Sequence, residues 1–412
     1  MTGAEISMEI LYLATLFSNC LSKYIPFSSY EDEILLAVLL LLFILKVCRS
    51  GAVIRGWNGY DVRLAVTLAL LMLTGTAGTI FNGKGVQEEA VVKDIVLAGK
   101  FFAAFLCAKT LFLSAEWEKI MRKIRKITRI AVVVIFVCGI ISLFVDIGMG
   151  DQIRFGLRSY QFLYTHYTFL VYAEVVMTAV LCSDAENDNR IYTAMAMGTM
   201  LLTLRTKAVV FCIVVLLFFF MEKFGKKIRL RWYLLAGGAG VAAAWGKISE
   251  YLAWGFSYNM RNGLYLAGAK LAAAFFPLGT GFAGFGSNLS YEYNPRIYYE
   301  LGLNTYQGFD VGRPVLSDVF WPYVYGEFGV LGLALYLAML AFLFWSLRHE
   351  LGGELEKLRG ANIIFAYLLV ASMAEAVFTN SSGVYSAVIL AFFFRKKRES
   401  APAPAKPFVI RL

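Results

Sequence analysis

Five cations stand in short segments between apolar stretches of the chain, where they can meet an anionic ligand. Two precede one apolar stretch, two occupy the turn between two others, and one lies within a long loop: Arg154 and Arg158, Arg205 and Lys207, and Arg261. Guanidinium groups make forked contacts to phosphate oxygens, so a cluster of this kind suits a diphosphate. The alternative for each arginine is a contact with lipid headgroups.

Two further side chains are of types that move protons. Asp318 lies where an apolar stretch begins, and its carboxylate is suited either to accept a proton from an attacking hydroxyl or to cap the following helix. His166 lies just inside the start of another apolar stretch. It is a candidate proton shuttle, and the alternative is a packing residue that hydrogen-bonds beside its aromatic neighbours.

The elements that position these residues are predicted to be membrane-spanning helices. Of the 412 residues, 59% are hydrophobic and only 17% are charged, whereas a soluble domain carries roughly 25% charged residues. This composition excludes a soluble fold, and the apolar blocks approach the length with which a helix crosses about 30 Å of hydrocarbon. We expect twelve spans, near residues 8–21, 34–48, 62–81, 91–113, 130–147, 162–182, 191–204, 208–221, 232–245, 319–347, 361–378 and 384–394.

The basic residues predict the orientation of these spans. The net charge of +10 comes largely from clusters in short loops, at residues 49–63, 119–129, 223–231 and 395–398. With twelve spans all four clusters fall on one side, which is the cytoplasmic side, so both termini are predicted to be cytoplasmic. Because the charge follows the membrane flanks, we predict no nucleic-acid partner.

One predicted extracytoplasmic loop is far longer than the others. It runs over about residues 247–317, between spans nine and ten, and we expect it to be a packed lid over a single transmembrane domain of residues 1–400. Residues 259–276 within it predict a helix at the outer leaflet that ends at Pro277. The Pro- and Ala-rich tail of residues 401–412 is predicted to be disordered and cytoplasmic.

Several acids stand in or beside the predicted spans. Glu31, Asp32 and Glu33 lie in the first extracytoplasmic loop, and we expect them to be solvated. Glu174 and Glu375 fall inside predicted spans, where an acid either serves function or pairs with a cation and holds the bundle together. None of these acids has metal-ligand spacing, so we predict no essential metal and no cofactor.

A glycine-rich run begins at Gly279. It formally matches a dinucleotide fingerprint, but that motif needs a preceding strand, a following helix and cytosolic access. We interpret Gly279 and Gly281 instead as a tight turn at the membrane surface, close to a ligand phosphate. Tyrosines after this run and Trp321 are suited to stack on sugar faces, and an interfacial aromatic belt is the alternative.

Taken in order, these motifs resemble the O-antigen ligase and Wzy-type polysaccharide polymerase superfamily. The resemblance covers about residues 154–345 and depends on the order and sidedness of short motifs: Arg154-Phe155-Gly156-Leu157-Arg158, Leu204-Arg205-Thr206-Lys207, Arg261, Pro277-Leu278-Gly279-Thr280-Gly281, Ser317-Asp318 and Tyr325-Gly326-Glu327-Phe328-Gly329-Val330-Leu331-Gly332. It implies a GT-C-like fold and an inverting glycosyltransferase of the bacterial cytoplasmic membrane. The expected substrates are an undecaprenyl-diphosphate-linked glycan donor and a second acceptor.

The resemblance also implies roles for single residues. Arg205 and Arg261 correspond to the diphosphate-binding arginines, with Arg154 or Arg158 assisting. Two positions depart from the pattern: Asp318 stands where ligases usually carry a histidine, and Leu204 stands where a serine is usual. The first departure favours a polymerase, whose acceptor is another lipid-linked repeat unit, and such an enzyme is expected to work with a chain-length regulator.

Three other functions stay open at this point. An O-antigen ligase would use the same donor with a different acceptor, and a lipid-linked oligosaccharide flippase or secondary transporter would share a layout of twelve spans. Another GT-C enzyme would use a polyprenyl monophosphate sugar, with Glu31 or Asp32 as its base.

Overall fold

The structure is a computed structural model that describes residues 3–21, 30–49, 56–83, 86–112, 117–150, 152–224, 259–309, 316 and 318–394. Within these residues the fold is all-α apart from one short hairpin. Eleven helices coincide with predicted spans, and the predicted span 232–245 and the tail 401–412 lie outside the described residues. The eleven are α1 (Gly3–Leu21), α2 (Glu31–Arg49), α3 (Gly59–Asn82), α4 (Glu88–Phe112), α5 (Trp117–Phe144), α6 (Tyr167–Cys182), α7 (Arg190–Leu202), α8 (Thr206–Phe224), α13 (Trp321–Leu351), α14 (Leu355–Ala371) and α15 (Ser381–Phe392).

Four of the described helices are long and apolar enough to cross a membrane: α3, α4, α5 from Lys119 onward, and α13. Helices α6, α8 and α15 are apolar but shorter. This pattern is that of an α-helical membrane protein. The total of twelve spans and the GT-C-like arrangement stay predictions.

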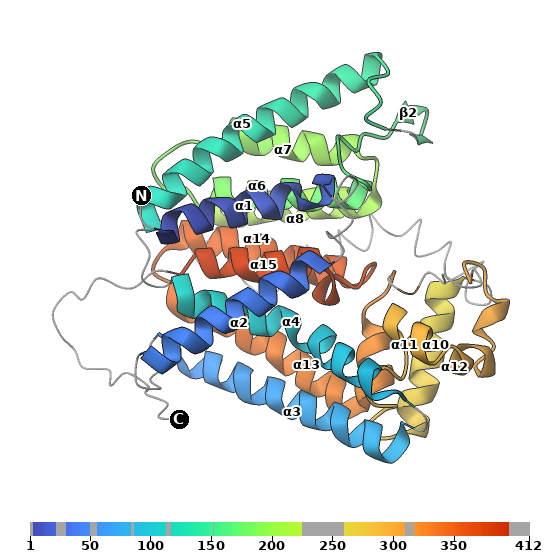
Figure 1. Cartoon of the computed structure of the whole chain (residues 1–412). Coiled ribbons are helices and arrows are strands. Elements are labelled where there is room, and N and C mark those ends of the chain that lie inside the picture. Colours follow the sequence, from blue (N-terminus) through green and yellow to red (C-terminus); the bar gives the residue numbers. More distant parts are fainter. Residues whose placement is uncertain are drawn as a thin grey trace.

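The helices lie side by side with their long axes in similar directions (Figure 1). The hairpin of β1 (Ile153–Arg154) and β2 (Leu157–Arg158) lies at one end of the helices, together with α10 (Met260–Ala274), α11 (Asn288–Tyr293) and α12 (Arg296–Glu300). The basic residues Arg49, Arg348 and His349 lie in the last turns of α2 and α13, at the opposite end. Following the predicted orientation, we call the end that carries the hairpin the outer end.

Two predicted spans continued too far into irregular segments. The sixth was expected from Phe162, but α6 begins at Tyr167, because Phe162 has a positive φ of 54° and the backbone N–H of Tyr160 donates to Leu202 O at 3.0 Å. The eleventh was expected to reach Phe378, but α14 ends at Ala371. Glu375 therefore lies in the turn after α14 and not inside a span, which corrects its predicted position.

The predicted lid has its own structure in the described part. The helix expected over residues 259–276 is confirmed as α10, whose N-cap Asn259 accepts the backbone N–H of Arg261 at 3.0 Å. A small core forms around α10, made by Met260, Leu264, Ala267, Leu271, Phe285, Tyr298, Leu303, Leu316 and Val319. Because α10 packs against α13, the lid is attached to the membrane helices by apolar contact.

The glycine-rich run that begins at Gly279 packs against a break in α13. At Gly329 the backbone leaves the helix (φ 65°, ψ −165°), which frees polar groups that must find partners elsewhere. The N–H groups of Thr280 and Gly281 donate to Gly326 O at 3.0 Å and Glu327 O at 2.8 Å. A Cβ on Gly281 would lie 2.2 Å from Thr79 N of α3, so only glycine fits there.

Two buried carboxyl groups fasten this loop to α4 and α13. The N–H of Ala283 donates to Asp94 Oδ2 at 2.8 Å, and the N–H of Phe285 donates to Glu327 Oε1 at 3.0 Å. The Tyr323 hydroxyl donates to Asp94 Oδ1 at 3.2 Å. Since both acids are completely buried, these bonds are what their burial requires.

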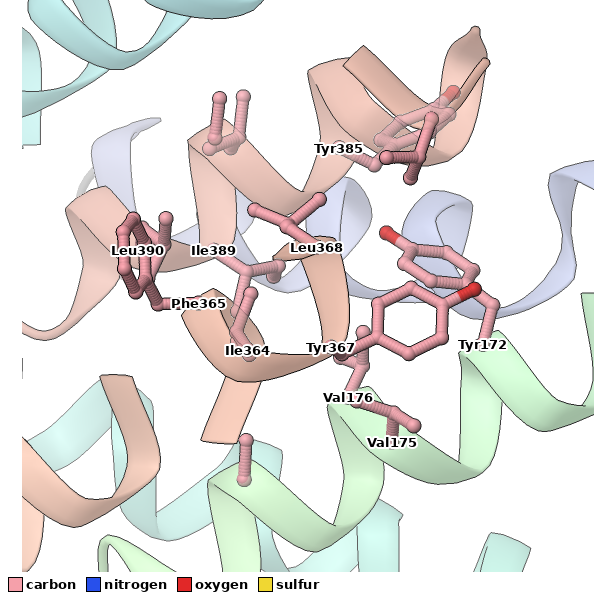
Figure 2. Packing of buried hydrophobic residues seen from close by; sticks show 14 of the residues in the cluster. Tyr172, Val175, Val176, Ile364, Phe365, Tyr367, Leu368, Tyr385, Ile389 and Leu390 are labelled. Atoms are coloured by element: carbon pink, nitrogen blue, oxygen red, sulfur yellow. The ribbon is translucent and has the colours of Figure 1, made fainter. Parts of the chain in front are cut away.

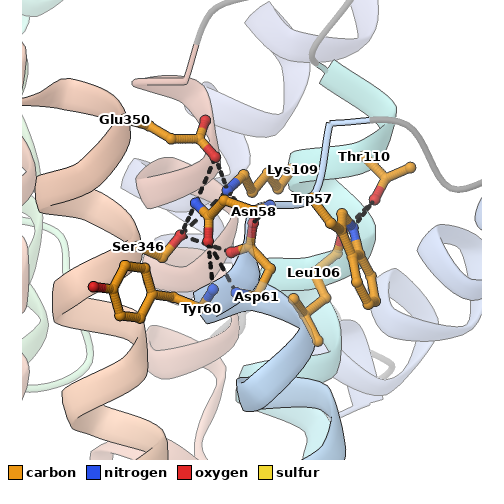
Figure 3. Close-up of polar contacts among 9 residues, drawn as sticks. All are labelled: Trp57, Asn58, Tyr60, Asp61, Leu106, Lys109, Thr110, Ser346 and Glu350. Atoms are coloured by element: carbon orange, nitrogen blue, oxygen red, sulfur yellow. Dashed lines mark hydrogen bonds and ion pairs between the residues drawn. The ribbon is translucent and has the colours of Figure 1, made fainter. Parts of the chain in front are cut away.

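A closed polar network lies at the other end of α3, α4 and α13 (Figure 3). Lys109 Nζ lies 2.6 Å from Asp61 Oδ2 and 2.7 Å from Glu350 Oε1. Ser346 Oγ donates to Asp61 Oδ1 at 2.6 Å, and Asn58 Nδ2 donates to Glu350 Oε1 at 2.7 Å. Each group has partners on a neighbouring helix, so the network fixes how the three helices pack.

Candidate functional site

Asp318 and Arg261 form an ion pair at the outer end. Nη2 and Nε of Arg261 lie 2.6 and 3.2 Å from Asp318 Oδ2, and both bonds end on the same oxygen. The predicted alternative of a helix cap is wrong, because α13 begins at Trp321 with Phe320 at its N-cap. The side chains are 34% and 38% exposed, so a ligand can reach the pair.

Arg205 lies in the tight turn between α7 and α8, as the sequence predicted. The turn is made possible by Leu204, whose φ is +52°. The guanidinium lies over the Tyr167 ring at 4.2 Å from its centroid, and Nη2 donates to Gln152 Oε1 at 3.0 Å. The aromatic face and the amide oxygen hold the cation at the start of α6.

Lys207, in the first turn of α8, points toward the turn that follows α14. Its Nζ lies 2.9 Å from Glu375 Oε2, and the hydroxyl of Tyr367 donates to Glu375 Oε1 at 3.2 Å. Tyr367 belongs to the core between α6, α14 and α15, where its ring lies 5.9 Å from that of Tyr172 (Figure 2). The core thus fixes Glu375, and Glu375 fixes Lys207.

His166 lies near these groups. It is the N-cap of α6 and not a residue inside the helix, since its Nδ1 accepts the backbone N–H of Thr168 at 3.3 Å. The ring is exposed at its surface, yet desolvation lowers its pKa, Arg205 and Lys207 lower that pKa further, and Glu375 and Asp318 raise it. Four charged groups from three segments therefore lie close enough to His166 to influence its titration.

The charges that act on His166 group part of the predicted site around it. His166, Arg205, Lys207 and Asp318 share one electrostatic neighbourhood, and Arg261 joins it through its pair with Asp318. The positions are separated by up to 152 residues in the numbering of the chain. What the arrangement can do chemically is bind an anion beside a carboxylate and an imidazole.

Two other predicted residues lie on the hairpin. Arg158 pairs with Asp146, and the half-buried side chain of Arg154 makes no polar contact with the described residues. The hairpin is joined to the Arg205 turn at its base, because Gln152 precedes β1 and Ser159 Oγ donates to Thr203 O at 2.6 Å.

The remaining predicted residues have packing roles in the structure. A Cβ on Gly279 would lie 2.5 Å from Glu327 O, and Gly281 packs on α3, so the close approach of both glycines is to protein backbone. The Tyr325 hydroxyl donates to Tyr265 O at 2.9 Å, which attaches α13 to α10.

Two hollows lined by described residues lie away from this cluster. One, of about 360 Å³, is apolar and lies between α1 and α5, with Phe17, Ile130 and Phe162 in its wall. The other, of about 810 Å³, lies at the turn between α6 and α7, where Asp184, Arg190 and Arg359 line it. Neither includes Arg205 or Arg261.

The three acids predicted to lie in a solvated loop form the first turn of α2, and Asp32 is not solvated. Asp32 is buried in an ion pair with Lys100 of α4, and Glu33 lies 3.1 Å from the same Nζ. Glu31, which precedes the predicted span 34–48, is half-buried. Burial, together with the charges of Asp32 and Glu33, raises the pKa of Glu31 to about 7.

Some partners were missed by sequence reasoning although the sequence carried a signal for them. Lys100, Asp94 and Lys109 are charged residues within the predicted span 91–113, and a charge in a span indicates a buried partner or a function. Gln152 carries no such signal, because an amide in a polar loop is ordinary. Its contact with Arg205 depends on how the loop folds.

Comparison with known families found no matching family model, and comparison with curated proteins found no match.

Proposed function

We propose that the chain is an inverting glycosyltransferase of the bacterial cytoplasmic membrane that polymerises undecaprenyl-diphosphate-linked repeat units on the extracytoplasmic side. The observation that carries this proposal is the common neighbourhood of His166, the Arg205–Lys207 turn and the Asp318–Arg261 pair. Partly exposed guanidinium groups beside a carboxylate suit a reaction in which a diphosphate departs and a hydroxyl attacks.

Arg205 and Arg261 bind the diphosphate of the donor in this mechanism. As the bond between the anomeric carbon and the diphosphate oxygen breaks, the leaving diphosphate takes the electron pair, and the guanidinium groups stabilise its charge. Charge that is already in place before the reaction costs no reorganisation during it. Lys207 adds to the positive potential while Glu375 holds it.

Asp318 is the proposed base. The acceptor hydroxyl forms the new bond to the anomeric carbon from the opposite face and gives its proton to the carboxylate. Both bonds from Arg261 end on Oδ2, so Oδ1 remains to take the proton. The pair therefore combines two tasks, because Asp318 orients the arginine that binds the leaving group and receives the proton of the incoming one.

The test is an assay of the purified protein with a defined undecaprenyl-diphosphate repeat unit, in which polymer and released undecaprenyl diphosphate are measured. Arg205→Ala should lower kcat/KM by roughly 10²-fold or more, as the loss of one preorganised charge contact does. The matched control is Arg296→Ala, since Arg296 of α12 is also at the outer end but, among the residues that the structure describes, pairs only with Glu300 of its own helix.

Equal activity of the Arg205→Ala and Arg296→Ala proteins at equal expression would remove Arg205 from the mechanism. Carrier release without polymer, seen only when a different acceptor is added, would indicate a ligase. Vesicle uptake of the substrate with no bond broken would indicate a flippase.

A second candidate is favoured by Glu31. Its pKa of about 7 matches that of a general base at neutral pH, which fits a GT-C enzyme that uses a polyprenyl monophosphate sugar. In that enzyme Glu31→Gln abolishes transfer from the monophosphate donor, and activity rises with pH through about 7 as Glu31 loses its proton. In the polymerase Glu31→Gln leaves kcat/KM with the diphosphate donor within about threefold of wild type, a change of under 1 kcal/mol.

A further inference from the structure

The β1–β2 hairpin, which follows α5 in the chain, exposes apolar side chains. Phe155 at its tip is 91% exposed, and Ile153 and Leu157 on either side are exposed as well. Single exposed apolar residues are normal on a protein surface, but a contiguous group of them indicates an interaction site for a protein or a membrane.

The turn itself is unfavourable for the residue that occupies it. Phe155 and Gly156 both have positive φ, 52° and 76°, the pattern of a two-residue hairpin turn in which Asn or Gly is preferred at the first position. A bulky aromatic residue there costs conformational energy. We therefore expect the side chain of Phe155 to make a favourable contact outside the turn that offsets this conformational cost.

The apolar surface of α5 runs directly into this hairpin. Exposed residues recur at intervals of four and three residues along one face of the helix, at Ile130, Val134, Val137, Ile141 and Phe144. In a spanning helix such a stripe faces the acyl chains. The stripe ends at Phe144, 83% exposed and the last residue of the candidate span, and the hairpin packs beside that end.

Charged groups border the same surface. Arg158 pairs with Asp146, which follows α5 by two residues, and Arg154 lies on the hairpin between exposed apolar neighbours. Arginines beside an inserted aromatic side chain match the phosphate level of a bilayer, with the apolar tip below it.

The base of the hairpin holds Arg205. Gln152 accepts from Arg205 Nη2 at 3.0 Å, and its own backbone N–H donates to the Tyr167 hydroxyl at 3.2 Å. Tyr167 is the ring over which the guanidinium lies. The position of Arg205 thus depends on where the hairpin lies.

We propose that the β1–β2 hairpin inserts its tip into the outer leaflet of the membrane and that Gln152, at its base, positions Arg205 relative to that surface. The ligand of the hairpin is the phospholipid surface, with Phe155 and Ile153 among the acyl chains and Arg154 at the phosphates. Insertion sets the depth of Arg205 near the headgroup level, where the phosphates of a lipid-linked substrate lie.

Insertion is tested with a photoreactive phenylalanine, p-benzoyl-phenylalanine, at position 155 of the full chain in phosphatidylcholine vesicles that contain a radiolabelled lipid. Illumination should attach labelled lipid to the protein. The same amino acid at Tyr299, an exposed position on α12, should attach at least about tenfold less. Equal labelling at both positions, no lipid label at 155, or crosslinks from 155 only to a second protein copy would overturn the proposal.

The positioning role rests on the proposed function and is tested by the variants Gln152→Ala and Gln152→Glu. Losing one hydrogen bond to a charged group should raise the KM for the diphosphate donor by about tenfold with kcat nearly unchanged. Gln152→Glu keeps an acceptor oxygen and should restore the KM. A fall in kcat alone, or no rescue by Glu, contradicts the role. If wild type shows no transfer, the proposed function fails while the lipid crosslink still tests insertion.

Discussion

The charged groups at the two ends of the bundle differ in their exposure to solvent. At one end Lys109, Asp61, Ser346 and Glu350 form a network in which Lys109 and Asp61 are almost completely buried (Figure 3). At the outer end Arg261 and Asp318 are about one third exposed. A closed network leaves no group for a ligand and makes removal of one member costly. An open pair contributes little to stability and keeps its atoms available for binding.

The largest expected effect is at the closed end. Lys109→Met leaves Asp61 charged and buried, so the free energy of unfolding should fall by about 3–5 kcal/mol. Thermal and denaturant unfolding in detergent measures this. The exposed pair of Lys93 with Glu89 is the control, since Lys93→Met should leave the unfolding midpoint close to that of wild type. If Lys109→Met combined with Asp61→Asn regains stability, the buried charge of Asp61 is the cause of the loss. A Lys109→Met protein as stable as wild type would contradict the contrast between the two ends.

At the open end the large effect should be on rate and not on stability. Asp318→Asn keeps an oxygen for Arg261 but cannot take a proton, so kcat should fall by roughly 10²–10⁴-fold while the melting temperature stays near that of wild type. Single-turnover transfer with lipid-linked repeat units measures this. Normal kcat would leave Asp318 with the sole role of holding Arg261.

Lys207 should lie between these extremes, because its pair with Glu375 is more buried than the Arg261 pair and less buried than the Lys109 network. Lys207→Met should destabilise the fold by about 1–2 kcal/mol, a figure reduced for the solvent that reaches the pair, and should also raise the KM for the donor. Adding Glu375→Gln should restore stability but not the KM. If the double variant restores both, Lys207 is structural.

The smallest expected effect is a dependence of stability on pH. The folded-state pKa of His166 is lowered below its ordinary value, so below about pH 6.5 the unfolded chain binds more protons than the folded one. Stability should therefore rise with pH up to about 6.5. His166→Asn keeps an N-cap acceptor. This variant should weaken the dependence of the melting temperature on pH between about pH 5 and 7. An unchanged slope would assign the dependence to other groups.

Much of the helical framework could be predicted, while the contacts of the site could not. The apolar blocks located eleven helices, and errors were confined to ends such as Phe162 and Glu375, where an apolar sequence continues through an irregular turn. The position of Arg205 in the turn was predicted correctly because little chain separates α7 from α8, whereas Lys207 lies in the first turn of α8. The pairing of Asp32 with Lys100 was not predicted, because three consecutive acids before an apolar stretch are typical of an ordinary polar loop.

By itself the sequence determined that the chain is helical and membrane-like and which charged residues stand at helix ends, because these properties depend on local hydrophobicity and length. Only the tertiary structure decided that Asp318 meets Arg261, that Arg205 meets Gln152 and that Gly281 meets Thr79. Each residue turns a helix face by about 100°, so a small change in helix register or in loop geometry selects a different partner. That choice is made by packing between segments far apart in the chain.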